Sequence, residues 1–136
     1  MTTAKVIYLQ NLRTESTHLY SGSKLITDAP LDNKGKGEAF SPTDLLCTSL
    51  ATCMITTMAI AAENYKILID GAVAEVEKIM ESNPRRIGEI KIKISMVGNY
   101  NEKERSVLER AALNCPVAKS LHEAVIQNIN FIYKKN

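Results

Sequence analysis

The sequence has few of the residues that build metal sites, and its positive charge is not concentrated. It contains two histidines, His18 and His122, far apart, and its three cysteines show no CxxC spacing. The net charge is +2, and the lysines and arginines are scattered rather than gathered into the basic face that a phosphate backbone requires. We therefore expect no metal, no other cofactor and no nucleic-acid partner.

Signals for secretion or membrane insertion are also scarce. The N-terminal stretch MTTAKVIYLQ alternates in polarity, whereas a signal peptide has a continuous apolar core. We find no run of about 18 uncharged apolar residues, the length of a membrane span. An odd number of cysteines in a chain of 136 residues argues against a secreted disulfide framework. We expect a soluble, cytoplasmic protein without a membrane partner, in which paired cysteines would indicate redox chemistry.

The composition fits one domain that covers residues 1–136. Hydrophobic residues make up 45% of the chain and charged residues 24%, which is ordinary for a globular domain with a full core. The first third predicts short strands at residues 5–10, 17–22 and 23–28, with Ser21-Gly22-Ser23 as a turn signal. Residues 29–41 contain a proline and two glycines among charged residues, which predicts an exposed loop.

A long helix is predicted to follow this loop. Ser41 has the character of an N-cap, and Pro42 suits the first helical position, where its missing N–H costs nothing. The helix should run to about Asn64. Because nearly every residue from 45 to 62 is apolar or small, we expect it to be the central helix and to be buried on most sides.

The second half of the sequence alternates between strand and helix patterns. In IGEIKIKISMV, isoleucines 90, 92 and 94 and Met96 share one face, which predicts a half-buried strand. We further predict a strand at 72–80, a helix at 102–113, a helix that begins at Pro116 and a terminal strand at 130–134. The chain therefore has the pattern of an α+β fold.

The three cysteines occupy different settings. At about 100° per residue, Cys53 and Cys47 project from different sides of the long helix, so they do not form a pair. Cys115 stands at the N-cap position before Pro116, where the helix dipole favours a thiolate. Free cysteine is among the most buried residue types, and we interpret Cys47 as a core residue. Spacing alone leaves Cys53 open between core residue and reactive thiol.

Two motifs resemble one known family. The segment SPTDLLCTSLATCM, with Cys53 eleven residues after Pro42, and the later segment NCPVAKSL are similar to those of the osmotically inducible protein C and organic hydroperoxide resistance (OsmC/Ohr) family. The resemblance covers about residues 5–134. It implies antiparallel sheets packed around a long central helix, in an intertwined homodimer with active sites between the subunits.

The resemblance also implies an activity and the residues that perform it. Cys53 would attack an organic hydroperoxide and become a sulfenic acid, and Cys115 would resolve it to a disulfide that a dithiol reductant, of the lipoyl type, reopens. A free cysteine is only a few per cent ionised at neutral pH, so this chemistry needs a cationic partner. The family takes an arginine from its N-terminal strands. Arg13 is the only arginine before residue 85, so the resemblance implies that it pairs with Cys53.

One departure from the family keeps a second function open. Peroxidases of the family have glutamate directly after the helix proline, whereas this chain has Thr43; Asp44 or Glu38 would have to take its place. The alternative is a protein that keeps the pocket at the dimer interface and binds an apolar or electrophilic small molecule without turnover. A purely structural pair of cysteines is a third possibility.

Other candidate residues have ordinary explanations. Arg85 and Arg86 follow a proline and are expected to be solvated. His122 is expected on the surface of the last helix, on the same face as Cys115. The glycines of DNKGKGEAF lack the spacing of a phosphate-binding loop.

Overall fold

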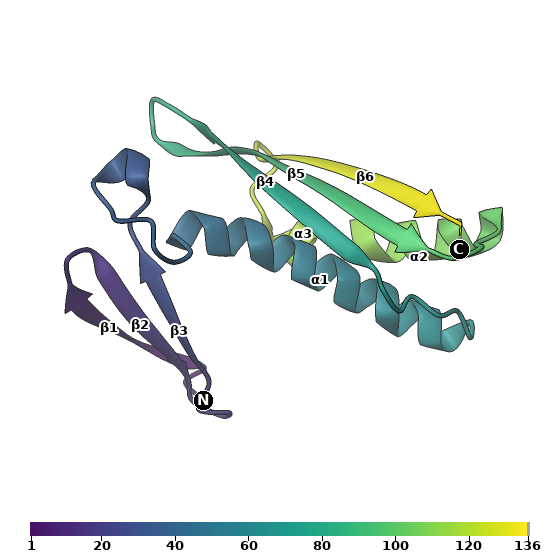
Figure 1. Ribbon diagram of the computed structural model, residues 1–136, viewed down its shortest axis with the longest axis horizontal. Helices are drawn as coiled ribbons and strands as arrows, with labels where there is room; N and C mark the ends of the chain where they lie inside the picture. Colours follow the sequence, from purple (N-terminus) through teal and green to yellow (C-terminus); the bar gives the residue numbers. More distant parts are fainter. Residues whose placement is uncertain (136) are drawn as a thin grey trace. The chain divides into compact units, whose positions relative to one another are not determined.

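The structure is a computed structural model that describes residues 1–135 (Figure 1). The chain divides into two compact units, Met1–Leu46 and Cys47–Asn136. The first contains strands β1 to β3 and a short 3-10 turn, and the second contains strands β4 to β6 and helices α2 and α3. The boundary falls within helix α1.

The first unit is an antiparallel sheet with the strand order β1-β2-β3. Its strands are β1 (Ala4–Gln10), β2 (Arg13–His18) and β3 (Lys24–Asp28). The prediction of a strand at 17–22 is wrong, because the chain turns there. The Gly22 amide donates to the His18 carbonyl at 2.7 Å, and Gly22 has a positive φ of 78°, which glycine adopts without strain. Leu19 and Tyr20, which suggested a strand, lie in this turn.

The residues of strand β1 are exposed to solvent along its whole length. All of its residues are exposed, and the apolar side chains of Val6 and Tyr8 are 63% and 62% exposed. Contiguous exposed apolar surface of this kind marks a contact surface in soluble proteins. The exposure of β1 therefore bears on the assembly of the protein.

Helix α1 (Pro42–Asn64) begins and ends where the sequence predicts. The Asp44 amide donates to Ser41 Oγ at 3.0 Å, and the Ser41 amide donates to Asp44 Oδ2 at 3.0 Å. This reciprocal capping satisfies backbone donors that a helix N-terminus otherwise leaves open. The carboxylate of Asp44 is therefore part of the helix cap.

The prediction that α1 is buried on most sides is wrong for the single chain. One face is buried, and the opposite face exposes Thr52, Thr56 and Ile60; the buried residues are Cys47, Leu50, Ala51, Met54, Met58 and Ala62. The expectation that no segment could span a membrane also needs correction. This helix has 23 residues and a window of mean hydropathy 1.8, because its serines and threonines lower the hydropathy only slightly. Its buried face nevertheless belongs to a protein core.

The second unit contains a mixed sheet with the order β4-β5-β6. Strand β4 (Val73–Glu81) is antiparallel to β5 (Arg86–Val97), whereas β5 and β6 (Ile126–Lys134) are parallel. The expectation of antiparallel pairing does not hold for β6. Two helices lie between β5 and β6 in the chain, and they return it to the end of the sheet where β5 begins, so that β6 runs parallel to β5. Strand β6 also begins earlier than the predicted 130, since Ile126 already pairs with Glu89.

The core of the second unit lies between its sheet, α1 and α2 (Glu102–Leu113). Ile90, Ile92, Ile94 and Met96 of β5 are at most 1% exposed, which confirms the predicted face of this strand. Helix α3 (Pro116–Ser120) begins at the predicted proline and is short. The fold is α+β, as predicted.

Candidate functional site

The second unit brings Cys53 and Cys115 close together. Cys53 lies on α1 and is half-buried, and Cys115 is the N-cap residue of α3, where it is 1% exposed. Cys53 lies close enough to Cys115 to raise the pKa of the Cys115 thiol, and both cysteines are free thiols. Two residues 62 positions apart in the sequence thus form one thiol pair.

Local contacts explain why the two thiols meet. One turn after Cys53, Thr57 Oγ1 donates to the Ala111 carbonyl at 3.2 Å and thereby joins α1 to the last turn of α2. The chain then turns, and the Cys115 amide donates to the Ala112 carbonyl at 3.3 Å. Pro116 starts α3 at once, because its fixed φ suits the first helical position. Cys115 is therefore held at the junction of α2 and α3, beside α1.

The electrostatic environment of Cys115 differs from the sequence-based expectation. Burial raises the pKa of its thiol above the ordinary value, and the neighbouring Cys53 raises it further. The amides of Ala118 and Val117 act in the opposite direction, and the Ala118 amide donates to Sγ at 3.4 Å. The N-terminus of α3 should lower the pKa of this thiol, but the helix has only five residues. The effect of burial is larger, because the thiol is almost fully buried. Cys115 is therefore kept as a protonated thiol at neutral pH.

The third cysteine lies apart from this pair. Cys47 is 1% exposed and belongs to the hydrophobic core, as predicted. It stands nearly two turns before Cys53 on α1. Burial of this kind suits a small apolar side chain rather than a reagent.

In the first unit, Arg13 forms a two-pronged ion pair with Asp28. Arg13 Nε donates to Asp28 Oδ1 at 2.7 Å and Arg13 Nη2 donates to Oδ2 at 2.9 Å. The two residues are directly opposite in the register of β2 and β3. Asp28 is 2% exposed, and the Glu38 amide also donates to its Oδ2, at 3.0 Å. Such bidentate pairs are among the strongest and most directional hydrogen bonds in proteins.

A second carboxylate completes this cluster. Glu38 Oε1 lies 3.5 Å from Arg13 Nη2, so one of the two expected substitutes for the family glutamate does contact the arginine. The pairing with Arg13 holds the pKa of Asp28 below its ordinary value and raises that of Arg13. Sequence reasoning missed Asp28, because the misplaced second strand put no residue opposite it. The correct register of β2 and β3 would have revealed the pair.

Arg13 and Cys53 belong to different units, so their pairing stays a prediction. The remaining candidates have structural roles. Arg86 Nη1 donates to the carbonyls of Ser82 and Pro84 and closes the β4–β5 turn. His122 lies beyond α3 rather than in it and accepts from the Ala124 amide at 3.0 Å. Within residues 1–135, the side chains of His, Cys, Asp and Glu form no group of three that could hold a metal.

Several solved structures have a fold similar to that of this chain. A protein of Psychrobacter arcticus 273-4, provisionally assigned to osmotic stress and detoxification responses, is 50% identical, with 96% of each chain covered and a TM-score of 0.93. The organic hydroperoxide resistance protein OsmC of Legionella pneumophila is 18% identical, covers 97% of this chain and 96% of its own, and has a TM-score of 0.78. The organic hydroperoxide resistance protein OhrB of Bacillus subtilis is 18% identical, covers 96% of this chain and 98% of its own, and has a TM-score of 0.71. A search of curated protein sequences found no match.

The sequence itself matches a family model. The model of the OsmC-like proteins matches residues 35–130, a range that contains the capped start of α1 and both members of the thiol pair. The α+β fold agrees with the solved structures along nearly the whole chain. With more than two thirds of its residues matched and both motif cysteines in place, the chain belongs to the OsmC-like family.

Proposed function

We propose that this protein reduces organic hydroperoxides in the cytoplasm, with Cys53 as the attacking thiol and Cys115 as the resolving thiol. The observation that carries the proposal is the proximity of these two free cysteines, which come from distant parts of the sequence. Membership of the OsmC-like family supports it, since two structures of the same fold are organic hydroperoxide resistance proteins.

The arrangement suits a two-step thiol reaction. The Cys53 thiolate attacks the distal oxygen of the hydroperoxide, the O–O bond breaks, and the alkoxide leaves as an alcohol after taking up a proton. The resulting sulfenic acid is attacked by the sulfur of Cys115, which releases water and forms a disulfide. A dithiol reductant then reduces this disulfide to two thiols and becomes a cyclic disulfide itself. Cys115 needs no free exposure for its step, because it already lies close to Cys53.

Arg13 is proposed as the cation that favours the reacting thiolate. Asp28 and Glu38 hold its guanidinium, so the arginine is oriented before substrate arrives. In this chain the buried Asp28 provides the carboxylate that Thr43 cannot provide. The absence of glutamate after Pro42 is therefore no longer a reason to prefer the binding protein without turnover.

We further propose that the protein is a homodimer. Two surfaces support this: the exposed apolar residues of β1 and the exposed face of α1, where Ile60 is 58% exposed. Analytical ultracentrifugation at micromolar concentration should give about twice the chain mass of 15.1 kDa. A species at the mass of one chain would contradict the dimer.

The function is tested by hydroperoxide consumption in the presence of a lipoyl-type dithiol or a small monothiol. The unmodified protein should turn over cumene hydroperoxide with the dithiol much faster than with the monothiol. Cys53→Ser should consume no peroxide, and Cys115→Ser should lose turnover with the dithiol. Cys47→Ser is the matched control and should keep its activity. Full activity in Cys53→Ser, or none in the unmodified protein with either reductant, would contradict the proposal.

A further inference from the structure

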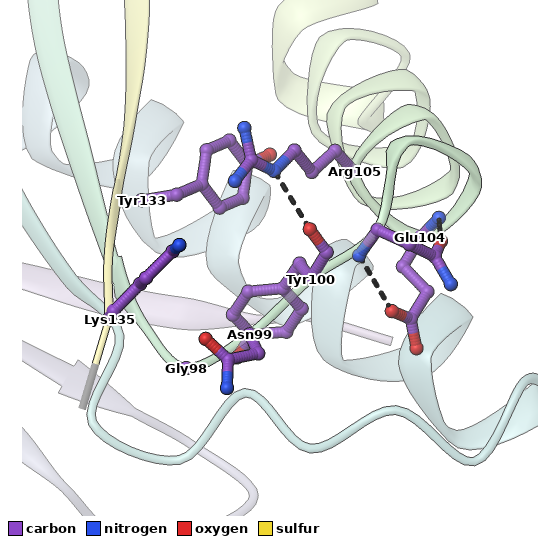
Figure 2. Close-up of a pocket in the computed structure, with 8 residues that line it drawn as sticks. Gly98, Asn99, Tyr100, Glu104, Arg105, Tyr133 and Lys135 are labelled. Carbon is purple, nitrogen blue, oxygen red and sulfur yellow. Dashed lines mark hydrogen bonds between the residues drawn. The ribbon is translucent and has the colours of Figure 1, made fainter.

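A cavity with no part in the thiol chemistry lies at the other end of the second unit. It has a volume of about 690 Å³ and opens where β6 ends and α2 begins (Figure 2). The lining residues come from the β5–α2 connection, the first turn of α2 and the end of β6; they are Gly98, Asn99, Tyr100, Asn101, Glu104, Arg105, Tyr133 and Lys135. Neither cysteine of the thiol pair is among them.

Two tyrosine rings form an aromatic wall of this cavity. Their centroids are 5.8 Å apart and their planes are tilted by 59°. Both hydroxyl groups are already used, since Tyr100 donates to the Leu68 carbonyl at 2.6 Å and Tyr133 donates to Glu109 Oε2 at 2.6 Å. The rings are therefore fixed in place, and what they offer to a ligand is apolar surface rather than a hydroxyl group.

Arg105 is held beside this wall by its side-chain Nε and by its contact with a tyrosine ring. Its guanidinium carbon lies 4.2 Å from the centroid of the Tyr133 ring, and its Nε donates to the Tyr100 carbonyl at 3.1 Å. Within residues 1–135, no carboxylate forms an ion pair with Arg105, and its Nη1 and Nη2 donate no hydrogen bond. The nearby Glu104 is engaged in the cap of α2, where its Oε1 accepts from the Asn101 amide at 2.9 Å.

A second positive charge faces the same space. Lys135 also lines the cavity, and Figure 2 shows it on the same side as Tyr133. Lys135 has no ion-pair partner among the described residues either. Arg105 and Lys135 thus bring two positive charges to the lining of one cavity, whose one carboxylate within residues 1–135, Glu104, is engaged in the α2 cap. An anion would be attracted to them. The fork of a guanidinium matches the two oxygens of a carboxylate.

We propose that this cavity binds a small molecule that carries a carboxylate on a flat apolar body. The carboxylate lies between Arg105 and Lys135, and the apolar body lies against Tyr100 and Tyr133. The volume of about 690 Å³ is that of an ordinary small-molecule site. Because the cavity shares no residue with the thiol pair, this site is independent of the proposed peroxidase activity.

The site is tested with naphthalene-2-carboxylate as the probe, by isothermal titration calorimetry. The probe should bind with saturation at one site per chain. Naphthalene-2-carboxamide has the same shape without the charge and should bind at least about tenfold more weakly, as expected for loss of a charge-assisted contact. Inorganic phosphate should also bind more weakly, because it has no apolar body. No saturation by the carboxylate up to about 10 mM, or equal binding of any two of these probes, would overturn the proposal.

Variants locate the binding in this cavity. Arg105→Gln and Lys135→Gln should each weaken the carboxylate at least several-fold, whereas Arg110→Gln, on the same helix but outside the cavity, should leave it unchanged. Lys135 is exposed, and within residues 1–135 its side chain forms no ion pair, so its variant reports on binding even if Arg105→Gln disturbs the packing on Tyr133. Equal losses in all three variants, or none in Lys135→Gln and Arg105→Gln, would show that the probe binds elsewhere.

Discussion

Native-state alkylation should separate the three cysteines by rate. Cys53 is half-buried, whereas Cys47 and Cys115 are each 1% exposed. A reagent such as N-ethylmaleimide can reach a thiol exposed to 1% only after the surrounding structure opens. Openings of protein cores approach the free energy of global unfolding, which is typically 5–15 kcal/mol. The order of reaction is thus set by burial and not by position in the sequence.

The expected magnitude follows from the cost of opening. Each 1.4 kcal/mol is a factor of ten in a population, so a local opening of about 4 kcal/mol slows alkylation about a thousandfold. The same factor applies to Cys115, because its thiol must also open to solvent before it can react. We therefore expect Cys53 to react first, by about three orders of magnitude.

The assay is pulsed alkylation followed by peptide mass spectrometry. A short pulse of N-ethylmaleimide under native conditions is followed by unfolding in guanidinium and an isotopically labelled second pulse, so each peptide reports its own rate. In guanidinium all three cysteines should react at similar rates, which is the control. Alkylation of Cys115 or Cys47 as fast as Cys53 in the native protein would refute the reasoning.

Three further predictions concern stability. Ser41→Ala removes the N-cap acceptor of α1 and should lower the free energy of unfolding by about 1 kcal/mol in urea titrations, and no change would contradict the capping role. Asp28→Asn should lower the melting temperature at neutral pH more than Glu38→Gln, since Asp28 is buried and Glu38 exposed. Because Arg13 holds the pKa of Asp28 below its ordinary value, the deficit of Asp28→Asn should shrink below about pH 4; a constant deficit would be inconsistent. The raised pKa of Cys115 gives stability that is lost as pH rises above about 8.5, so thermal scans of Cys115→Ser should show a weaker decline than the unmodified protein, and equal declines would exclude this linkage.

Features with a strong local signal could be predicted from the sequence. Ser41 and Pro42 mark the start of α1 because capping and the fixed φ of proline act within a few residues. The alternation in β5 likewise identified its buried face. The family resemblance pointed to Cys53 and Cys115, and the structure brings their side chains together.

Features that depend on tertiary contacts could not be predicted. Asp28 was missed because its role depends on the register of β2 against β3, which no local pattern specifies. The parallel pairing of β6 depends on the path of α2 and α3. The raised pKa of Cys115 results from burial at the junction of those helices, which outweighs the local effect of the N-cap position.

The two-cysteine mechanism is tested most directly by mapping the disulfide after oxidation. The reduced protein is treated with one equivalent of cumene hydroperoxide, free thiols are blocked, and the digested peptides are analysed by mass spectrometry. The mechanism predicts a Cys53–Cys115 disulfide with Cys47 still reduced, and in Cys115→Ser it predicts sulfenic acid on Cys53 that proceeds to sulfinic acid in excess peroxide. A disulfide that includes Cys47, or unmodified Cys53 after peroxide treatment, would contradict it.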